Sequence, residues 1–206
     1  MAVFFTADLH FGHKNIIKYD KRPFKDVQEM EDEMVARWNA AVRPEDTVYM
    51  LGDVLWTRDP KEGAAILDRL NGHKRLIVGN HDGIILDNPS LRAKFDSIKP
   101  YDEVVIKLED GETRKCVLSH YFIPLFNGFN KGAILLHGHS HISPSADLEA
   151  DMVEFLKFKG IDVERYNVGC MYYYYRPVTL DEILFEREIE SQERILLDKS
   201  NDDDTR

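Results

Sequence analysis

Seven side chains that could bind metal ions follow runs of apolar residues in this sequence. They are Asp8, His10, Asp53, Asn80, His120, His139 and His141. Oxygen and imidazole groups without cysteine are typical ligands of Mn, Fe, Zn or Mg. Seven ligands are too many for one tetrahedral ion, but they suit two ions that share a carboxylate. Two metals about 3.5–4 Å apart can drive in-line displacement at phosphorus, because they polarise phosphoryl oxygens and activate a water at neutral pH.

Each of these motifs is weak evidence when it is taken alone. A single Asp-x-His arises more often by chance, and Gly52-Asp53 is more often a turn. His139-Ser140-His141 also fits an exposed loop, and Gly79-Asn80-His81-Asp82 also fits a tight turn. Unrelated turns do not explain why all of them occur in order at the ends of predicted strands. The combined pattern therefore indicates one metal site.

The elements that position these residues alternate between strands and helices in the first half of the chain. Short apolar runs predict buried strands at residues 2–7, 47–51 and 75–78. A 3.6-residue apolar period predicts a helix at 26–42, and Pro60 precedes a second helix at 61–70. A short helix is expected at 15–19. Ligands of α/β proteins bind beyond the carboxyl ends of strands, which is where the metal-binding residues stand.

Hairpins are more frequent in the second half. Strands are predicted at 103–108 and 113–119, joined by the turn signal Asp110-Gly111. Further strands are predicted at 133–136, 165–168 and 172–175, and a last helix at 180–197. We expect one α/β domain over residues 1–198, with two packed sheets and helices outside. Residues 199–206 are nearly all polar, and we expect a disordered tail there.

The composition excludes several classes of protein. The chain has 206 residues, of which 43% are hydrophobic, with 27 Lys and Arg against 37 Asp and Glu. The formal net charge is −10 and no basic cluster occurs, so we expect no binding to double-stranded nucleic acid. No apolar run is long enough to cross a membrane, and the N-terminus does not resemble a signal peptide. Two cysteines suit a reducing cytoplasm, where we expect the protein to act.

Five ordered motifs resemble those of the calcineurin-like metallophosphoesterase superfamily. They are Asp8-Leu9-His10, Gly52-Asp53, Gly79-Asn80-His81-Asp82, Ser119-His120 and Gly138-His139-Ser140-His141. Residues 11–17, 167–169 and 176–182 resemble a small bacterial and phage branch of predicted phosphoesterases. The resemblance implies a four-layer αββα sandwich, in which two mixed β-sheets are flanked by helices.

The resemblance also implies a role for each site residue. One divalent ion would bind Asp8, His10, Asp53 and His141, and the other would bind Asp53, Asn80, His120 and His139. Asp53 would bridge the two ions, of which Mn²⁺ is favoured, while Fe, Zn, Ni and Mg are also accepted. His81 would contact the substrate phosphate and assist the leaving group. Asp82 would orient the His81 imidazole and favour its protonated form.

The sequence therefore predicts a metal-dependent hydrolase of phosphoesters, with a metal-bridging hydroxide attacking phosphorus in line. Small phosphodiesters or nucleotides are the expected substrates, and diesters are favoured over monoesters. Residues 52–58 lack the Gly-Asp-x-x-Asp-Arg-Gly motif of protein Ser/Thr phosphatases, and Asp82 replaces their Glu. One alternative is a metal-dependent nuclease acting on single-stranded DNA or RNA. A second is a non-catalytic protein-binding scaffold, which the presence of His81 disfavours. The sequence indicates no oligomeric state.

Other polar and aromatic residues leave two interpretations open. His13 is either a substrate contact or a partly buried polar residue. His137 fits packing at a strand end, or support of a ligand, better than direct ligation, and His73 fits a solvated loop. Asn127 could reach substrate or simply form a turn. For the run at residues 172–175, sheet packing is favoured over base stacking.

Overall fold

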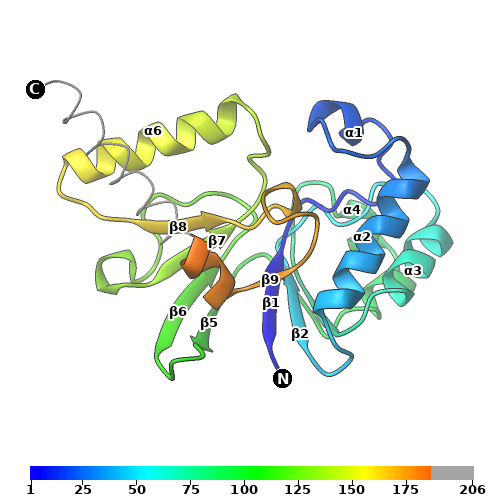
Figure 1. Cartoon of the computed structure of the whole chain (residues 1–206), viewed down its shortest axis with the longest axis horizontal. Helices are drawn as coiled ribbons and strands as arrows, with labels where there is room; N and C mark the ends of the chain where they lie inside the picture. The colour runs from blue at the N-terminus through cyan, green and yellow to red at the C-terminus, as the bar shows by residue number, and fades with distance from the viewer. Residues whose placement is uncertain (187–206) are drawn as a thin grey trace, which may run out of the picture.

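Two β-sheets lie face to face in the computed structural model, which describes residues 1–186 (Figure 1). The first sheet has the strand order β4-β3-β2-β1-β9 and the second has the order β5-β6-β7-β8. The strands of the first sheet are β1 (Val3–Thr6), β2 (Thr47–Met50), β3 (His73–Ile77), β4 (Ser97–Lys99) and β9 (Val178–Thr179). Those of the second are β5 (Asp102–Lys107), β6 (Thr113–Leu118), β7 (Ile134–His137) and β8 (Glu164–Asn167).

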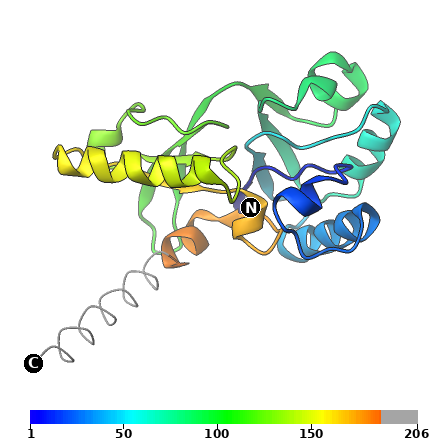
Figure 2. The same cartoon turned by 90° about the horizontal axis from the view of Figure 1, so that it is seen from above.

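Helices flank the pair of sheets on both sides (Figures 1 and 2). They are α1 (Ile16–Tyr19), α2 (Val27–Ala41), α3 (Pro60–Asp68), α4 (Gly83–Asp87), α5 (Pro89–Arg92) and α6 (Pro144–Phe158), with 3-10 turns at Phe129–Lys131 and Cys170–Tyr172. Helical backbone also begins at residue 180 and continues to 186. The remainder of the predicted last helix and the predicted C-terminal tail lie outside the described residues. None of the described helices is long and apolar enough to cross a membrane.

Three apolar clusters hold these layers together. Successive side chains of a strand point to opposite faces, so Phe4 packs toward α2 and α3, whereas Phe5 packs between the sheets. The cluster between the sheets joins Phe5 and Leu51 to Leu118 and Leu136. A third cluster fixes α6 on the outer face of the second sheet through Leu156. These three cores confirm the predicted sequence of layers, helix, sheet, sheet, helix.

Helix α2 shows how local sequence builds one outer layer. The Asp26 side chain accepts a hydrogen bond from the Glu29 amide at 2.9 Å and so caps the first turn. Met30, Met34 and Trp38 lie on one face and are almost fully buried against the first sheet. The Trp38 indole nitrogen donates to a backbone carbonyl at 3.0 Å, which satisfies its buried polar atom. The predicted period of 3.6 residues therefore describes this helix correctly.

The parallel strands bring several carboxyl ends to one region of the molecule. β1 pairs in parallel with β2, β2 with β3, β6 with β7, and β7 with β8. Beyond β1, the Ala7 amide donates to the Val168 carbonyl at 2.9 Å, and Ala7 forms a parallel bridge with Gly169. The first sheet is thus joined to the segment that follows β8 in the second sheet. The loops that follow the strands of both sheets therefore meet at this edge.

Two parts of the sequence-based prediction differ from the structure. The predicted strand at residues 172–175 is wrong, because the chain turns there: the Tyr175 amide donates to the Cys170 carbonyl at 2.8 Å, and Tyr174 and Tyr175 have positive φ. Tyr173 and Tyr175 are buried, with the Tyr175 ring 4.9 Å from the ring of Phe24, whereas Tyr172 and Tyr174 are exposed. Helices α4, α5 and α6 and strands β4 and β9 were not predicted. Most of the large apolar side chains of α6 face outward, so its sequence lacks a clear buried stripe.

Candidate metal centre

All seven predicted metal ligands lie in loops that follow five strands. Asp8 and His10 follow β1, Asp53 follows β2, Asn80 follows β3, His120 follows β6, and His139 and His141 follow β7. Two sheets therefore contribute to one site. The ligands come from positions up to 133 residues apart, and the convergence of strand ends brings them together.

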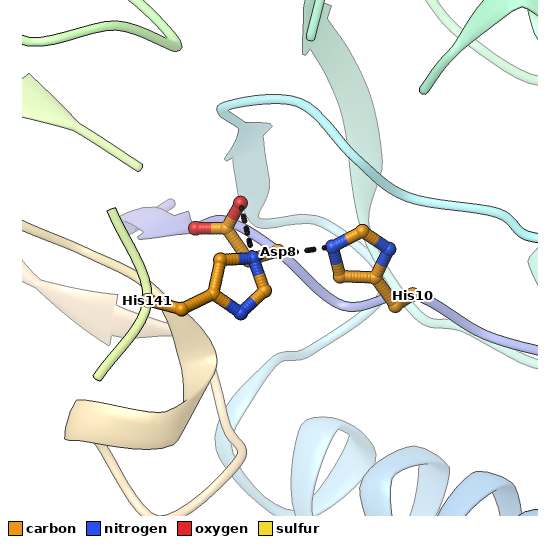
Figure 3. Close-up of side chains that lie close together, drawn as sticks. All are labelled: Asp8, His10 and His141. Atoms are coloured by element: carbon orange, nitrogen blue, oxygen red, sulfur yellow. Dashed lines mark hydrogen bonds and ion pairs between the residues drawn. The ribbon is translucent and has the colours of Figure 1, made fainter. Parts of the chain in front are cut away.

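The first group of ligand atoms consists of Asp8, His10 and His141 (Figure 3). The Nε2 atoms of His10 and His141 are 3.3 Å apart, and His141 Nε2 is 3.6 Å from Asp8 Oδ1. Asp8 and His10 are buried, whereas His141 is partly exposed. Two imidazole nitrogens and one carboxylate oxygen thus face one another at distances that a cation between them would span.

The second group consists of Asp8, Asp53 and His120, all of them buried. Asp53 Oδ2 lies 3.6 Å from His120 Nε2 and 3.7 Å from His10 Nε2, so this oxygen stands between the two groups. Asn80 Oδ1 is 3.0 Å from His120 Nε2. The side chains of Asp8 and Asp53 are therefore both placed to serve two ions.

The ring of His139 lies beside this second group. Its centroid is 5.1 Å from that of His120 and 4.8 Å from that of Tyr121. The backbone amide of His139 donates to both carboxylate oxygens of Asp8, at 3.1 and 3.0 Å. His139 thus holds a ligand through its backbone and offers its imidazole at the surface of the site.

Four of the seven residues have a backbone conformation that L-amino acids rarely adopt. The φ angles of Asp8, His10, Asp53 and His139 lie between 51° and 73°. Such residues each cost about 1–3 kcal/mol and persist where the surrounding structure holds them. Backbone hydrogen bonds stabilise these conformations. The Asp8 amide donates to the Gly52 carbonyl at 3.1 Å, and the His10 amide donates to the Asp53 carbonyl at 2.9 Å. The two ligand loops of the first sheet are therefore locked to each other.

Gly52 permits the close packing of these loops. Its φ is 88°, and a Cβ atom at this position would lie 2.7 Å from the Gly79 Cα and would collide with His120 Nδ1. That imidazole nitrogen is 2.7 Å from the Leu51 carbonyl, which fixes the ring with Nε2 toward Asp53. The glycine in the Gly-Asp motif is thus needed to seat a histidine of the other sheet.

The electrostatics of the first group suit a divalent cation. Burial raises the pKa of the Asp8 carboxyl to about 6 and lowers the pKa of the His10 imidazole to about 2. Burial also lowers the pKa of His141, but the hydrogen bond to Asp20 and the charge of Asp8 outweigh it and leave that pKa raised. A cation would compensate the buried carboxylate and bind neutral imidazoles. The donor set and its burial therefore fit a bound metal ion.

Asp20 and Arg22, which the sequence did not indicate, stabilise the group of Asp8, His10 and His141. The Asp20 carboxylate lies 2.8 Å from His141 Nδ1, which leaves Nε2 of that ring for a metal. The buried Arg22 guanidinium donates to Asp20 Oδ2 at 3.0 Å and to the carbonyls of Asp8 and Leu9 at 2.8 and 2.9 Å. Asp20 and His141 are 121 residues apart, so no local spacing could have revealed the contact.

Asp82 makes contacts other than those expected from its place in the motif. Its carboxylate accepts hydrogen bonds from the amides of Asp53, Val54 and Gly79 at 3.0, 2.9 and 2.8 Å. Both oxygens are engaged, and the side chain is fully buried. The expected contact with the His81 imidazole is thus replaced by bonds that tie together the loops after β2 and β3. Asp82 holds the backbone that carries the predicted ligands Asp53 and Asn80.

His81 stands at the mouth of the site, with 40% of its side chain exposed. Its Nε2 atom is 4.0 Å from Asp53 Oδ2, and its amide donates to Asp53 Oδ1 at 2.8 Å. The neighbouring wall is aromatic, since the Trp56 ring lies 4.6 Å from His81 and stacks on His13 at 4.2 Å. These residues line a cavity of about 640 Å³ that includes His10, His139 and His141. A small substrate could therefore reach both the ligands and His81.

The other polar residues considered from sequence lie elsewhere. His137 is buried behind the ligand loop, with Nδ1 3.0 Å from the Gly138 carbonyl, and burial lowers its pKa to about 3. Asn127 donates to the Glu103 carboxylate on β5. His73 begins β3 and is 3.0 Å from Asp96. Of the residues for which the sequence left two interpretations, only His13 lines the cavity.

Comparison with known proteins gives a consistent result. Residues 1–195 match the family model described as calcineurin-like phosphoesterase. The uncharacterised protein MJ1445 of Methanocaldococcus jannaschii is 32% identical over 183 residues, which are 88% of this chain and 89% of that protein. The Gene 66 protein of Mycobacterium phage L5 is 37% identical over 158 residues, covering 66% of this chain and 76% of that protein.

A solved structure has the same arrangement. The Aquifex aeolicus protein AQ665, described as of unknown function, has a TM-score of 0.61 and 28% identity, covering 92% of this chain and 98% of that one. The family match spans the five strand-end motifs, and side chains from all five lie together in the structure. The chain therefore belongs to the calcineurin-like phosphoesterases, a family of dinuclear metal-dependent enzymes.

Proposed function

We propose that this protein hydrolyses small phosphodiesters or nucleotides with the help of two divalent ions, Mn²⁺ being favoured. The observation that carries the proposal is the position of Asp53 Oδ2. It lies within 4.0 Å of Nε2 of His10, His120 and His81. Asp53 itself lines the cavity of about 640 Å³. Two ions held there would polarise the phosphoryl oxygens and lower the pKa of a water.

The residues of the chain divide the remaining tasks. Asp8, His10 and His141 would hold one ion, and His120 with Asn80 and His139 would hold the other, with Asp53 shared. His81, at the mouth of the cavity, protonates the oxygen that leaves phosphorus. General acids of this kind typically contribute 10²–10⁴-fold to the rate.

The charge of the cavity favours diesters over monoesters. Among the described residues that line it, none is Lys or Arg. A phosphodiester carries one negative charge, whereas a monoester carries close to two near pH 7. Apart from the two ions and a protonated His81, the extra charge of a monoester would meet no further cationic side chain. We therefore propose phosphodiesterase activity as the main reaction.

The proposal also covers partners and location. With a net charge of −10, a small substrate is favoured over duplex nucleic acid. Cys116 and Cys170 are both free and buried, as suits a reducing compartment, and we propose that the protein acts in the cytoplasm. Manganese is proposed because carboxylate and imidazole donors suit it.

Hydrolysis of bis(4-nitrophenyl) phosphate beside 4-nitrophenyl phosphate tests this function. The Mn²⁺-loaded protein should turn over the diester faster. The His81→Ala variant should keep both ions, measured by elemental analysis, and lose about 10²-fold or more of the rate. Undiminished turnover by His81→Ala would overturn the role of His81. Absence of turnover in the wild-type protein with two ions bound would favour the non-catalytic scaffold.

A further inference from the structure

A second cavity adjoins the metal cavity. It has a volume of about 510 Å³ and shares Trp56, Asn80 and His81 with the larger one. Its remaining lining includes Thr57 and Arg58 from the loop after β2 and Gly83 from the start of α4. Trp56 and His81 thus border two adjacent cavities, of which only the larger is lined by predicted acidic and histidine ligands.

The two cavities differ in charge. Among the described residues that line them, Arg58 is the only Lys or Arg. Within residues 1–186, Arg58 takes part in none of the ion pairs found. Two carboxylates close to Arg58 in the sequence make other contacts: Asp59 accepts from the Lys61 amide at 2.8 Å, and Glu62 accepts from the Thr57 hydroxyl at 2.7 Å. The Arg58 guanidinium is therefore available to an anion in the second cavity.

The position of His81 determines how a bound substrate is oriented in the two cavities. If His81 protonates the leaving oxygen, the leaving half of the diester must lie next to its ring. That ring borders both cavities, while the phosphorus must lie at the metal ligands of the larger one. The leaving half therefore extends past Trp56 into the cavity that holds Arg58. Trp56 is 42% exposed and offers an aromatic surface along this path.

We propose that Arg58 binds a second phosphate on the leaving half of the substrate, and that the natural substrates are short nucleotide diesters with such a phosphate. This inference rests on the proposed function. Arg is well suited to the task, because its planar guanidinium donates two parallel hydrogen bonds to phosphate oxygens. A cyclic nucleotide lacks a second phosphate and would leave Arg58 without an anionic partner.

The test uses thymidine dinucleotides that carry no terminal phosphate, a 5′-phosphate or a 3′-phosphate. With the Mn²⁺-loaded wild-type protein, kcat/KM should be about tenfold higher for one of the phosphorylated dinucleotides than for the unphosphorylated one, as a charge-assisted hydrogen bond predicts. Arg58→Gln should remove this preference, and Arg58→Lys should restore part of it. Arg92→Gln, which changes another exposed arginine outside both cavities, should keep the preference.

The outcomes distinguish failure of the Arg58 subsite from failure of the proposed phosphodiesterase activity. A preference that is absent in the wild-type protein, or that survives in Arg58→Gln, overturns the Arg58 subsite while the phosphodiesterase stands. A failure of the wild-type protein to hydrolyse bis(4-nitrophenyl) phosphate overturns the proposed function and the subsite with it. Melting temperatures and bound manganese, measured for all variants, show that each protein is folded and loaded.

Discussion

Replacing Asp20 by asparagine removes one negative charge from the contacts that support His141. The native carboxylate lies 2.8 Å from His141 Nδ1 and accepts from Arg22 Nε and Nη2 at 3.2 and 3.0 Å. The side chains of Asp20 and Arg22 are only 4% and 0% exposed, so water cannot take over these contacts. Asparagine has almost the same shape, and the substitution therefore changes charge and hydrogen bonding more than packing.

The expected effect is a weaker metal site on one side of the centre. Changes to the hydrogen-bond partner of a metal-binding histidine typically lower metal affinity 10–100-fold. This corresponds to about 1.4–2.8 kcal/mol, at about 1.4 kcal/mol per factor of ten. The ion held by Asp8, His10 and His141 should lose this affinity. The ion held by the group around His120 should keep more of its affinity, because Asp20 reaches that group only indirectly, through Arg22 and His141, which contact Asp8.

Calorimetric titration of Mn²⁺ into the metal-stripped proteins measures the two affinities separately. Asp26→Asn is the matched control, since it makes the same chemical change at the cap of α2, where asparagine caps as well as aspartate. A folded Asp20→Asn protein that binds both ions with wild-type affinity would refute the reasoning. An equal loss at both sites would show that the outer contacts act on the whole centre and not through His141.

Three further predictions concern the shared carboxylate, acid stability and the thiols. Asp53→Asn removes an oxygen that lies between both ligand groups, so the variant should bind at most one Mn²⁺, and elemental analysis showing two would contradict the bridging role. Burial raises the pKa of Asp46, but hydrogen bonds from two backbone amides outweigh it and leave that pKa below its usual range. Its stabilisation is therefore present above the unfolded pKa of about 3.9 and is lost as the pH falls through the lower folded value. Consequently, Asp46→Asn should lower the melting temperature at neutral pH, with a difference that shrinks in acid; a difference that is constant with pH would count against this. Burial raises the pKa of both Cys116 and Cys170 to about 12, so a thiol reagent near pH 8 should label neither in the folded protein and both after unfolding.

Both the order of the layers and the clustering of the site residues could be predicted from the sequence, for one physical reason. Parallel strands end at a shared edge, so the polar residues that follow within three positions of Thr6, Met50 and Ile77 must be neighbours. Residue type then indicated the chemistry, because carboxylates and imidazoles without cysteine suit hard and intermediate metal ions. Both steps use information that is local in the sequence.

The features that could not be predicted from the sequence depend on contacts between residues far apart in the chain or on tertiary packing. Asp20 supports His141 from a position 121 residues away, and nothing near either residue marks the pair. Asp82 is adjacent to His81 in the chain, yet its carboxylate turns to three backbone amides. Helix α6 was missed because Leu148, Met152 and Phe155 face outward, so a buried stripe is absent. In each case tertiary packing decides the outcome.

The division of the ligands between the two sheets has a consequence for folding. Asp8 and Asp53 follow strands of the first sheet, whereas His120 and His141 follow strands of the second. A bound ion would therefore act as a cross-link between the halves of the sandwich, and separation of the sheets would require its release. Ions that bind only the folded chain raise its stability in proportion to the logarithm of their concentration. Neither half of the chain has the full donor set, so binding of the divalent ions and docking of the two sheets would be one coupled equilibrium.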